Sequence, residues 1–363
     1  MSLKVSSISL VNFRNFESFG VVLDPGLTVL VGDNAVGKTN TVEALQLVTS
    51  GRSFRRPKPL ELLREGAEEG RCEGRIEGDG RVIDVECEIA QGKRTFRRNG
   101  KACHAADLAG TLMSILFCPD DLSLAKGSAS LRRQEIDTFG SQASQGYDKV
   151  VRNYAKAIEQ RNSFLKGEWA DEVFLDAWDE TVALGAATLL YHRASLFGRL
   201  ATRFSEVYRE ISGGERAQAT YVSSLPGGPF GRSKEEIRQD MVEALHQARD
   251  EDLRRQFTTV GPHRDDIEFA ISGRSARTYG SQGQQRSIVL AWKMAEVMVS
   301  QDVIGETPLL LLDDVMSELD EARRAALTSF VEEGLQTVVT TTNMGYFPER
   351  LLSRAKVVEY HGR

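Results

Sequence analysis

The sequence lacks the features of a membrane protein and of a disulfide-stabilised protein. Its 363 residues include only four cysteines, which are scattered singly and form no C-x-x-C pair, so neither a zinc site nor a disulfide framework is implied. Apolar runs such as 288–292 and 309–312 are far shorter than the roughly 20 residues of a membrane-spanning helix. Because the first residues also lack the charged-then-apolar layout of a signal peptide, we expect a cytoplasmic protein.

A net positive charge is also lacking. The formal net charge is −6, although 27% of the residues are charged. The whole molecule is therefore not attracted to phosphate, and any DNA-binding surface must be a local basic patch. The length allows about two domains, and the hydrophobic content of 41% is ordinary for a globular protein.

The order of the predicted elements favours an α/β domain that is interrupted by helices and then resumes. Short β-branched or alternating runs predict strands at 27–31, 83–89 and 113–117, and Asn99-Gly100 predicts a hairpin turn. Residues 131–213 have helical periodicity. Two apolar stripes there are separated by a polar turn at 166–168, which favours an antiparallel helical hairpin.

Strand signals return after a further predicted helix over 234–256. They lie at 267–271, 308–312 and 337–340, and another helix is expected to start near Gly283. We therefore expect an α/β head with mixed sheets that is interrupted by a mainly helical second lobe. The expected boundaries are 1–120 for the first part of the head, 121–256 for the helical lobe and 257–363 for the resumed head.

A phosphate-binding loop lies at residues 32–39, which fit G-x-x-x-x-G-K-[ST] between a predicted strand and a predicted helix. Backbone N–H groups of such a loop curl around phosphates, and the helix N-terminus favours the anion. Lys38 would reach the β and γ oxygens of ATP, and the Thr39 hydroxyl would ligate Mg²⁺. A chance glycine-rich turn is the alternative, but the motif stands in its full context. The expected nucleotide-binding residues here are Gly32, Asp33, Asn34, Ala35, Val36, Gly37, Lys38, Thr39 and Asn40.

Two acids, Asp313 and Asp314, end the apolar run at 309–312. A buried parallel strand delivers its C-terminal residues to the crevice where ligands bind. Asp313 would hold Mg²⁺, and Asp314 would polarise the attacking water. A strand that stops at two solvated acids is common in isolation, but a neighbouring phosphate loop favours the catalytic interpretation. ABC-type heads usually carry Glu at the second position, so the shorter Asp314 predicts slower hydrolysis.

A Ser-x-Gly-Gln segment, with Ser281, Gly283 and Gln284, precedes an apolar helical stretch. At a helix N-terminus it offers a hydroxyl and free N–H groups to an anion. It resembles the ABC signature, usually written LSGGQ, and lies 32 residues before Asp313; residues 317–320 resemble the D-loop of the same class. A plain N-cap at Ser281 is the alternative. The order of the three motifs favours the nucleotide-binding interpretation.

With these motifs the chain resembles the RecF family, which shares the head of ABC and SMC ATPases. The resemblance covers essentially the whole chain and includes residues 12–16, 32–40, 51–55, 126–127, 261–266 and 279–286. It implies an ABC ATPase head with a helical second lobe, ATP and Mg²⁺ as cofactors and a weak DNA-stimulated ATPase. It also implies that Arg14 and Asn15 reach the nucleotide, although a surface turn is an equal alternative there. We interpret His263 as a structural or interface residue.

The resemblance further implies how the protein acts. Its members form an ATP-dependent homodimer in which Ser281 would meet the γ-phosphate held by Lys38 of a second subunit. The dimer would clamp DNA at gaps or single-strand/double-strand junctions and help load the recombinase RecA together with RecR, and hydrolysis would reset it. The implied context is recombinational repair, DNA replication and the SOS response to DNA damage.

The DNA-binding residues are less specific. Three basic clusters stand out, namely Arg52, Arg55, Arg56 and Lys58, then Lys93, Arg94, Arg97, Arg98 and Lys101, then Arg132 and Arg133. Such residues neutralise phosphates, but ordinary solvated charge is the slightly favoured alternative for any one cluster. That at least one cluster binds DNA is implied mainly by the resemblance.

Two other classes remain open. An SMC-like factor would interrupt the head with a long coiled coil, and sustained heptads are missing here. The ATPase subunit of a membrane transporter would carry a switch histidine after the strand at 337–340. The sequence there has none, so any γ-phosphate sensor must be a hydroxyl or an amide.

Overall fold

The structure is a computed structural model that describes residues 2–167 and 172–361. The chain divides into two compact units. The first comprises Met1–Leu122 and Val289–Arg363, and the second comprises Ser123–Ile288. Within the described ranges, no helix is long and apolar enough to cross a membrane.

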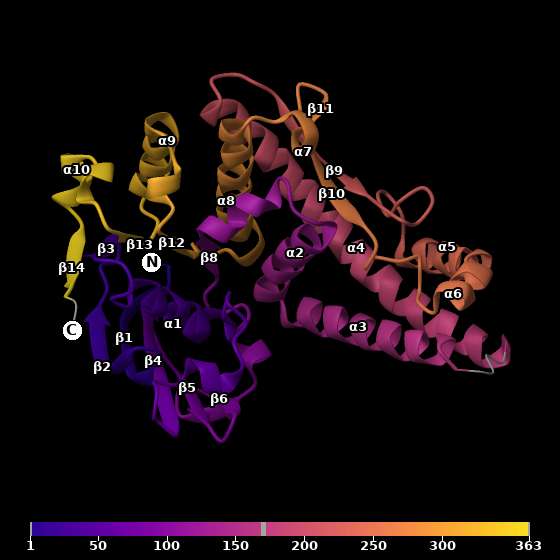
Figure 1. Ribbon diagram of the computed structural model, residues 1–363, viewed down its shortest axis with the longest axis horizontal. Coiled ribbons are helices and arrows are strands. Elements are labelled where there is room, and N and C mark those ends of the chain that lie inside the picture. Colours follow the sequence, from indigo (N-terminus) through magenta and orange to yellow (C-terminus); the bar gives the residue numbers. More distant parts are fainter. Residues whose placement is uncertain (1, 168–171, 362–363) are drawn as a thin grey trace. The chain divides into compact units, whose positions relative to one another are not determined.

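The first unit contains an all-parallel sheet of five strands (Figure 1). Its order is β14-β3-β13-β12-β8. The central strands are continuous apolar or β-branched runs because both faces of a parallel sheet are covered. The strands are β3 (Leu27–Gly32), β8 (Ser114–Phe117), β12 (Leu309–Asp313), β13 (Thr337–Thr341) and β14 (Lys356–Tyr360).

A second sheet of the same unit is antiparallel and has six strands in the order β2-β1-β4-β5-β6-β7. Buried and exposed residues alternate along its strands, as in a sheet with one face on the core. Asn99-Gly100 forms the predicted hairpin turn. The strands are β1 (Lys4–Phe13), β2 (Phe16–Val22), β4 (Glu69–Gly78), β5 (Arg81–Ala90), β6 (Lys93–Arg98) and β7 (Lys101–Cys103).

Helix α1 (Lys38–Ser50) lies between the two sheets, which explains why nearly all its residues are buried. Val48 packs so closely on Gly74 of β4 that a side chain at Gly74 would meet it at 2.6 Å. On the other side, Thr49 donates a hydrogen bond to Ser114 of β8 (2.8 Å). The helix that begins at the phosphate loop is therefore the centre of this unit's core. Further helices of the unit are η1 (Pro59–Leu62), η2 (Ala105–Leu108), η4 (Met316–Glu318), α9 (Glu321–Glu332), η5 (Met344–Tyr346) and α10 (Glu349–Leu352).

The second unit is mainly helical and carries one small sheet. Helix η3 (Pro119–Leu124) leads into it, and α8 (Gln282–Ile304) leads out of it. The sheet has the order β11-β10-β9. The elements of the second unit are α2 (Ala129–Ala143), α3 (Gln145–Leu165), α4 (Glu172–Ile211), β9 (Ala217–Val222), α5 (Lys234–Gln247), α6 (Arg249–Arg255), β10 (Asp266–Ile271), β11 (Arg274–Ser275) and α7 (Ala276–Tyr279).

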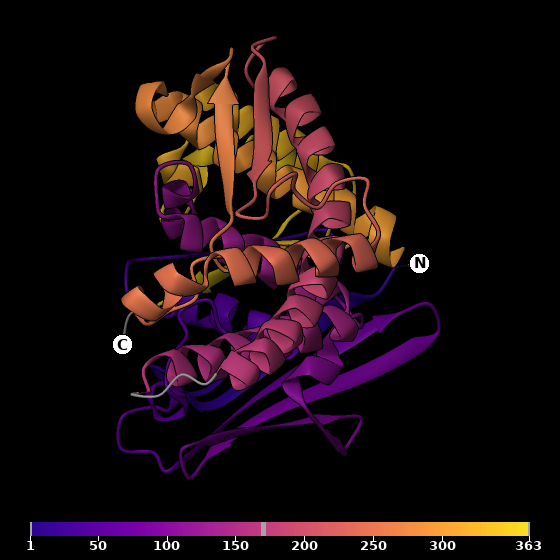
Figure 2. The same ribbon diagram turned by 90° about the vertical axis from the view of Figure 1, so that its right-hand side faces the viewer.

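The predicted helical hairpin is confirmed for its two helices, which lie side by side (Figure 2). Tyr154 of α3 packs on Gly185 of α4, and Arg161 of α3 binds Asp179 of α4, so the helices run antiparallel. Of the predicted turn at 166–168, Glu168 lies outside the described residues.

Two sequence expectations differ from the structure. The single helix expected over 234–256 is two helices, α5 and α6, which are separated by Ala248. Asp252 of α6 binds Arg161. The head was also expected to resume at residue 257. Residues 257–288 belong instead to the second compact unit, because β10 pairs with β9, a strand that the sequence analysis missed. The division into a head (1–120 and 257–363) and a helical lobe (121–256) as functional parts stays a prediction.

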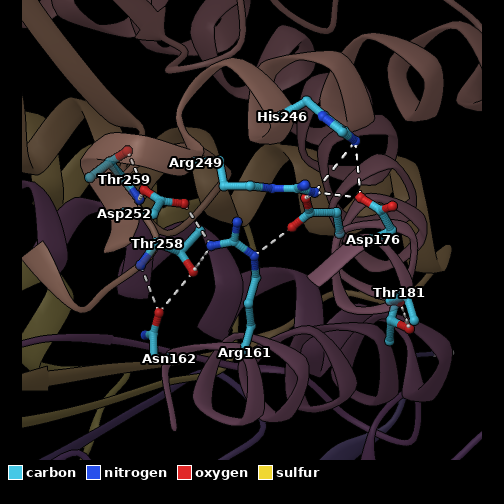
Figure 3. A network of polar contacts seen from close by, with 11 residues as sticks. Arg161, Asn162, Asp176, Thr181, His246, Arg249, Asp252, Thr258 and Thr259 are labelled. Carbon is cyan, nitrogen blue, oxygen red and sulfur yellow. Dashed lines mark hydrogen bonds and ion pairs between the residues drawn. The ribbon is translucent and has the colours of Figure 1, made fainter. Parts of the chain in front are cut away.

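A buried ionic network stabilises the helical hairpin near the C-terminal end of α3 and the N-terminal end of α4 (Figure 3). Arg161 is fully buried and donates to Asp179 (2.7 Å), Asp252 (2.6 Å) and the Thr258 hydroxyl (2.9 Å). Arg249 binds the second oxygen of Asp179 (2.7 Å). The network therefore joins α3, α4 and α6 to the segment that precedes β10.

The segment at 261–266 connects several elements of the same unit through buried contacts. A side chain at Gly261, whose φ is +129°, would meet the Tyr154 hydroxyl at 2.5 Å. His263 Nδ1 lies 2.6 Å from that hydroxyl, and His263 Nε2 lies 3.0 Å from the Thr258 carbonyl. Burial lowers the pKa of His263 to about 4, so the ring is neutral at pH 7. Asp265 accepts hydrogen bonds from Tyr221 and Ser224.

Replacing Arg161 by Ala should destabilise the protein by about 3–5 kcal/mol, because Asp179 and Asp252 lose a buried cation. The control is Arg203→Ala, which removes an exposed pair with Glu206 on α4 and should cost at most about 1 kcal/mol. Urea unfolding followed by circular dichroism measures both. Equal losses in the two variants would contradict the structural importance of the buried network.

Candidate nucleotide site

The phosphate loop is a tight turn that rests on the β1–β2 connection. Gly37 has φ +116°, and a side chain there would lie 2.4 Å from the Phe16 ring. Asn15 donates its side-chain amide to the Val36 carbonyl (3.1 Å). Ala35 also adopts a left-handed conformation, with φ +64°. Contacts with Asn15 and Phe16 thus hold the loop between β3 and α1 in a curled conformation that suits phosphate binding.

Lys38 extends its ammonium group back over the loop. It donates hydrogen bonds to the carbonyls of Gly32 (2.7 Å) and Asp33 (2.6 Å). Burial lowers the pKa of Lys38, and the negative charges of Asp314 and Asp313 oppose that shift. The ammonium group therefore lies among the groups expected to handle phosphate and metal.

An open pocket of about 540 Å³, counting the space open to solvent, lies above the loop. All its lining residues belong to the first unit, and most are polar. They are Asn34, Ala35, Gly37, Lys38, Thr39, Asn40, Arg55, Asp314 and Thr340. The structure thus brings most of the predicted phosphate-loop residues together with Asp314.

Asp313 lies at the end of β12 and is almost completely buried. Its Oδ1 atom accepts two hydrogen bonds, from the hydroxyls of Thr39 (2.9 Å) and Thr340 (2.8 Å). Burial raises the pKa of Asp313, and these two bonds oppose the shift. Since Thr39 gives its proton to Asp313, its oxygen lone pairs point elsewhere. A hydroxyl and a carboxylate are hard oxygen ligands, so the pair fits Mg²⁺.

Asp314 follows in an unusual backbone conformation with φ +55°. Its N–H donates to the Thr340 hydroxyl (2.9 Å), and its carbonyl accepts from Ser317 (2.9 Å). Burial raises the pKa of Asp314, Lys38 opposes the shift and Glu318 adds to it. A carboxylate with a raised pKa in this pocket is suited to accept a proton from water.

A buried carboxylate that the sequence analysis missed organises one wall of the site. Glu43 of α1 is fully buried and binds Arg14 through both carboxylate oxygens (2.9 and 2.8 Å). It also accepts from Ser53 (2.5 Å) and Arg55 (3.4 Å). The signal available in the sequence was an acid placed between the apolar residues Val42 and Ala44 in the predicted helix after the phosphate loop.

Asn15 contacts the loop and Arg14 binds Glu43 of α1, but neither is among the lining residues of the pocket. Arg14 also donates to the Glu61 carbonyl (2.6 Å), and Asn15 accepts from Asn40 (2.8 Å). Their contact with nucleotide stays a prediction. Arg55, expected only as part of a basic cluster, lines the pocket instead and donates to Asn40 (2.8 Å).

The signature segment belongs to the second unit and starts α8. The Ser281 hydroxyl accepts from the Gln284 N–H (3.2 Å), and the Gln284 side-chain carbonyl accepts from the Ser281 N–H (2.9 Å). Ser281 is therefore an N-cap, as the alternative interpretation held. Because its hydroxyl acts as the acceptor in that bond, its own proton remains to be donated, so capping and anion binding are compatible.

Glu215 holds this capping arrangement in place, and the sequence analysis missed it. One carboxylate oxygen accepts from the Gln284 side-chain amide (2.8 Å), and the other accepts from the hydroxyl of Tyr208 on α4 (2.8 Å). The bond from the Gln284 amide turns its carbonyl toward Ser281. The long helix α4 and the signature segment are thereby joined through one carboxylate.

The basic clusters differ in what they offer to DNA. Arg132 is buried and binds Asp266 through two bonds (2.7 and 2.9 Å), so it is a structural cation. Arg133 donates to the Asp265 carbonyl (2.6 Å), and burial lowers its pKa. The pleat of β6 divides the hairpin cluster: Lys93 and Arg97 lie on one face, and Arg94 and Arg98 on the face of buried Phe96.

Comparisons with known proteins identify the family. A family model described as the RecF/RecN/SMC N terminal domain matches residues 4–358. The DNA replication and repair protein RecF of Symbiobacterium thermophilum is 40% identical over 343 residues, which cover 94% of this chain and 92% of that protein. The chain belongs to the RecF family. RecF of Heliobacterium modesticaldum is 38% identical over 365 residues, covering 98% of this chain and 96% of that protein.

Solved structures agree with this membership. A structure of the recombination mediator protein RecF, described as RecF-ATPrS in the RecFOR pathway, matches this RecF family member with a TM-score of 0.89 and 30% identity. It covers 96% of this chain and 94% of the other. An Smc head bound to a domain of ScpA matches with a TM-score of 0.57 at 16% identity, covering 98% of this chain and 93% of that chain, a likeness of fold alone. The expected family and the α/β ABC-type head are confirmed.

Replacing Glu215 by Ala should loosen the signature segment of this RecF family member. Loss of a helix cap costs about 1 kcal/mol, so the amides of Ser281 and Gln284 should exchange about five times faster. Amide hydrogen exchange read by NMR or mass spectrometry measures this, and Glu210→Ala, at an exposed position near the end of α4, is the control. Unchanged protection in Glu215→Ala would show that Glu215 does not hold the cap.

Proposed function

We propose that this RecF family member is a DNA replication and repair ATPase that binds ATP with Mg²⁺ in the pocket above the phosphate loop. The observation that carries the proposal is the convergence of Lys38, Thr39, Asp313 and Asp314 at that pocket. Relatives described as DNA replication and repair protein RecF, and a solved RecF structure described with ATP, support it.

The residues have separate roles in ATP binding and hydrolysis. Lys38 reaches the β and γ oxygens, and backbone N–H groups of the loop bind the phosphates. Thr39 and Asp313 would hold Mg²⁺, which would neutralise charge on the phosphate oxygens. Asp314 orients the attacking water and accepts its proton, helped by its raised pKa. Its side chain is one methylene shorter than Glu, so hydrolysis is slow.

The ATP-bound form is a homodimer in this proposal. The pocket is formed by first-unit residues, whereas Ser281 belongs to the second unit and has a hydroxyl proton to donate. Ser281, Gly283 and Gln284 of one subunit would meet the γ-phosphate that Lys38 of the other holds. Such an interface is isologous, so two ATP molecules are buried per dimer, and hydrolysis releases the subunits.

DNA is the partner that the ATP-bound dimer would clamp, at gaps or single-strand/double-strand junctions. On the β5–β6 hairpin the acids Glu86 and Glu88 share a face with Lys93 and Arg97. The opposite face carries Arg94, Arg98 and Lys101 beside apolar residues of β5. This second face packs on the core through Val85, Cys87, Ile89 and Phe96, but Arg94 is only half-buried and Arg98 and Lys101 are exposed. We place phosphate contacts on these three cations, because no acid of β5 or β6 on the same face offsets them.

Repair partners complete the proposal. The solved relative is described as a recombination mediator in the RecFOR pathway. By family membership, the DNA-bound dimer would act with RecR to help load RecA in the cytoplasm, with weak ATPase activity stimulated by DNA. ATP turnover then sets how long the dimer marks a site on DNA.

The DNA face can be tested by charge reversal with a matched control. Arg94→Glu combined with Arg98→Glu should weaken binding to all DNA sequences alike and reduce the dependence of affinity on salt, because phosphate contacts are lost. Lys93→Glu with Arg97→Glu changes the same charge on the opposite face and should have less effect. Fluorescence anisotropy over a salt series measures both. Full affinity in the first variant would remove this face from the proposal.

The composite site can be tested at Ser281. Ser281→Arg should leave ATP binding by the monomer intact but block ATP-dependent dimerisation and hydrolysis, because a bulky cation replaces the hydroxyl donor. Ser281→Thr keeps the hydroxyl and the cap and should behave like the parent. Analytical ultracentrifugation with ATP and Mg²⁺ reports assembly.

A mixing experiment sharpens this test. A heterodimer of Ser281→Arg with Lys38→Met has one composite site with an intact phosphate loop and an intact signature. Partial recovery of assembly and hydrolysis on mixing is the expected result. If Ser281→Arg alone dimerises and hydrolyses ATP like the parent, Ser281 is only a helix cap.

A further inference from the structure

Thr340 lies at the C-terminal end of β13, between the two acids of the site. Its side chain is only 1% exposed, yet it lines the nucleotide pocket. Its hydroxyl donates to Oδ1 of Asp313 (2.8 Å) and accepts the N–H of Asp314 (2.9 Å). A single hydroxyl therefore bonds to the side chain of one acid and to the backbone of the other.

We propose that Thr340 is a positioning residue that sets Asp313 for metal binding and Asp314 for water activation. This inference rests on the proposed ATPase function and deepens it. A hydroxyl has one proton, and Thr340 gives that proton to Asp313. Thr340 thus lies in the segment where a γ-phosphate sensor was expected, but its hydroxyl proton is donated to Asp313.

The next residue, Thr341, shows that this role is particular to Thr340. Thr341 is equally buried, but its hydroxyl donates to the carbonyl of Asn343 (3.0 Å) and accepts the Asn343 N–H (3.0 Å). It closes the turn after β13 and has no hydrogen bond to either acid among the described residues. The two threonines therefore form a natural pair for a matched comparison.

The hydroxyl of Thr340 restrains both the rotation of the Asp313 carboxylate and the backbone conformation of Asp314. Oδ1 of Asp313 accepts from Thr39 in the first turn of α1 and from Thr340 at the end of β13, and the two bonds together hold the carboxylate plane. Without Thr340, the carboxylate can rotate away from the metal-binding orientation. Asp314 has a left-handed backbone, which a non-glycine residue keeps only when its surroundings hold it. The bond from its N–H to Thr340 is one such restraint.

The test is Thr340→Val, which keeps the side-chain shape and replaces the hydroxyl by a methyl group. Partners of metal ligands typically contribute 10–100-fold in metal affinity or activity. We therefore expect the Mg²⁺ midpoint for ATP binding to rise, and the rate of hydrolysis to fall, by roughly 10–100-fold. ATP binding without Mg²⁺ should stay unchanged, because the contacts of Lys38 and the phosphate loop remain. Asp314→Asn provides the comparison, since it should slow hydrolysis without moving the Mg²⁺ midpoint.

Two control variants separate positioning from general stability. Thr340→Ser keeps the hydroxyl and should restore the Mg²⁺ midpoint and the rate. Thr341→Val removes a hydroxyl from the same buried strand end and should leave both values near those of the parent. Equal losses in Thr340→Val and Thr341→Val, or parental values in Thr340→Val, would overturn the proposal.

A measurement without nucleotide keeps the inference separate from the proposed function. Thr340→Val should speed amide exchange at Asp314 in the free protein, whereas Thr341→Val should not. If the parent failed to bind ATP, the ATPase proposal would fall, and the exchange at Asp314 would still decide whether Thr340 holds the acids. Unchanged exchange at Asp314 in Thr340→Val would contradict the positioning role.

Discussion

The hydrogen bonds from Thr39 and Thr340 to one oxygen of Asp313 are the interaction on which the site depends. They join the first turn of α1 to the ends of β12 and β13. Because α1 lies between the two sheets of the first unit, the core fixes where the phosphate loop can be. Packing that stabilises the fold therefore also sets the position of the Asp313 carboxylate relative to the phosphate loop.

The second unit is organised by buried charge instead of a continuous sheet. Arg161 forms ion pairs with Asp179 of α4 and Asp252 of α6. Gly261, which has no side chain, allows the loop before β10 to pack against Tyr154. At the other end of α4, Glu215 connects Tyr208 to the signature segment. Helix α4 thus connects the buried network of the hairpin with the residues that hold Ser281, an arrangement that suits the proposed contact of the signature segment with a second subunit.

Much of this architecture could be predicted from local sequence. The phosphate loop, the strand before Asp313 and the stripes of α3 and α4 follow from motif and periodicity within short windows. Glu43, Glu215 and Thr340 could not be found that way, because their partners are distant in sequence: Glu43 binds Arg14, and Thr340 binds Asp313. The assignment of the basic residues of β6 to two faces of the sheet also needed the register of β5 and β6. In the sequence alone these residues look like one cluster.

The most direct test of the account is calorimetric titration of ATP into the unmodified chain and into Lys38→Met, with and without Mg²⁺. The account predicts one ATP per chain, tighter binding with Mg²⁺ and loss of binding in Lys38→Met, because that change removes the cation on the β and γ phosphates. ATP binding by Lys38→Met with the affinity of the parent would contradict the assignment of the pocket above the phosphate loop as the nucleotide site.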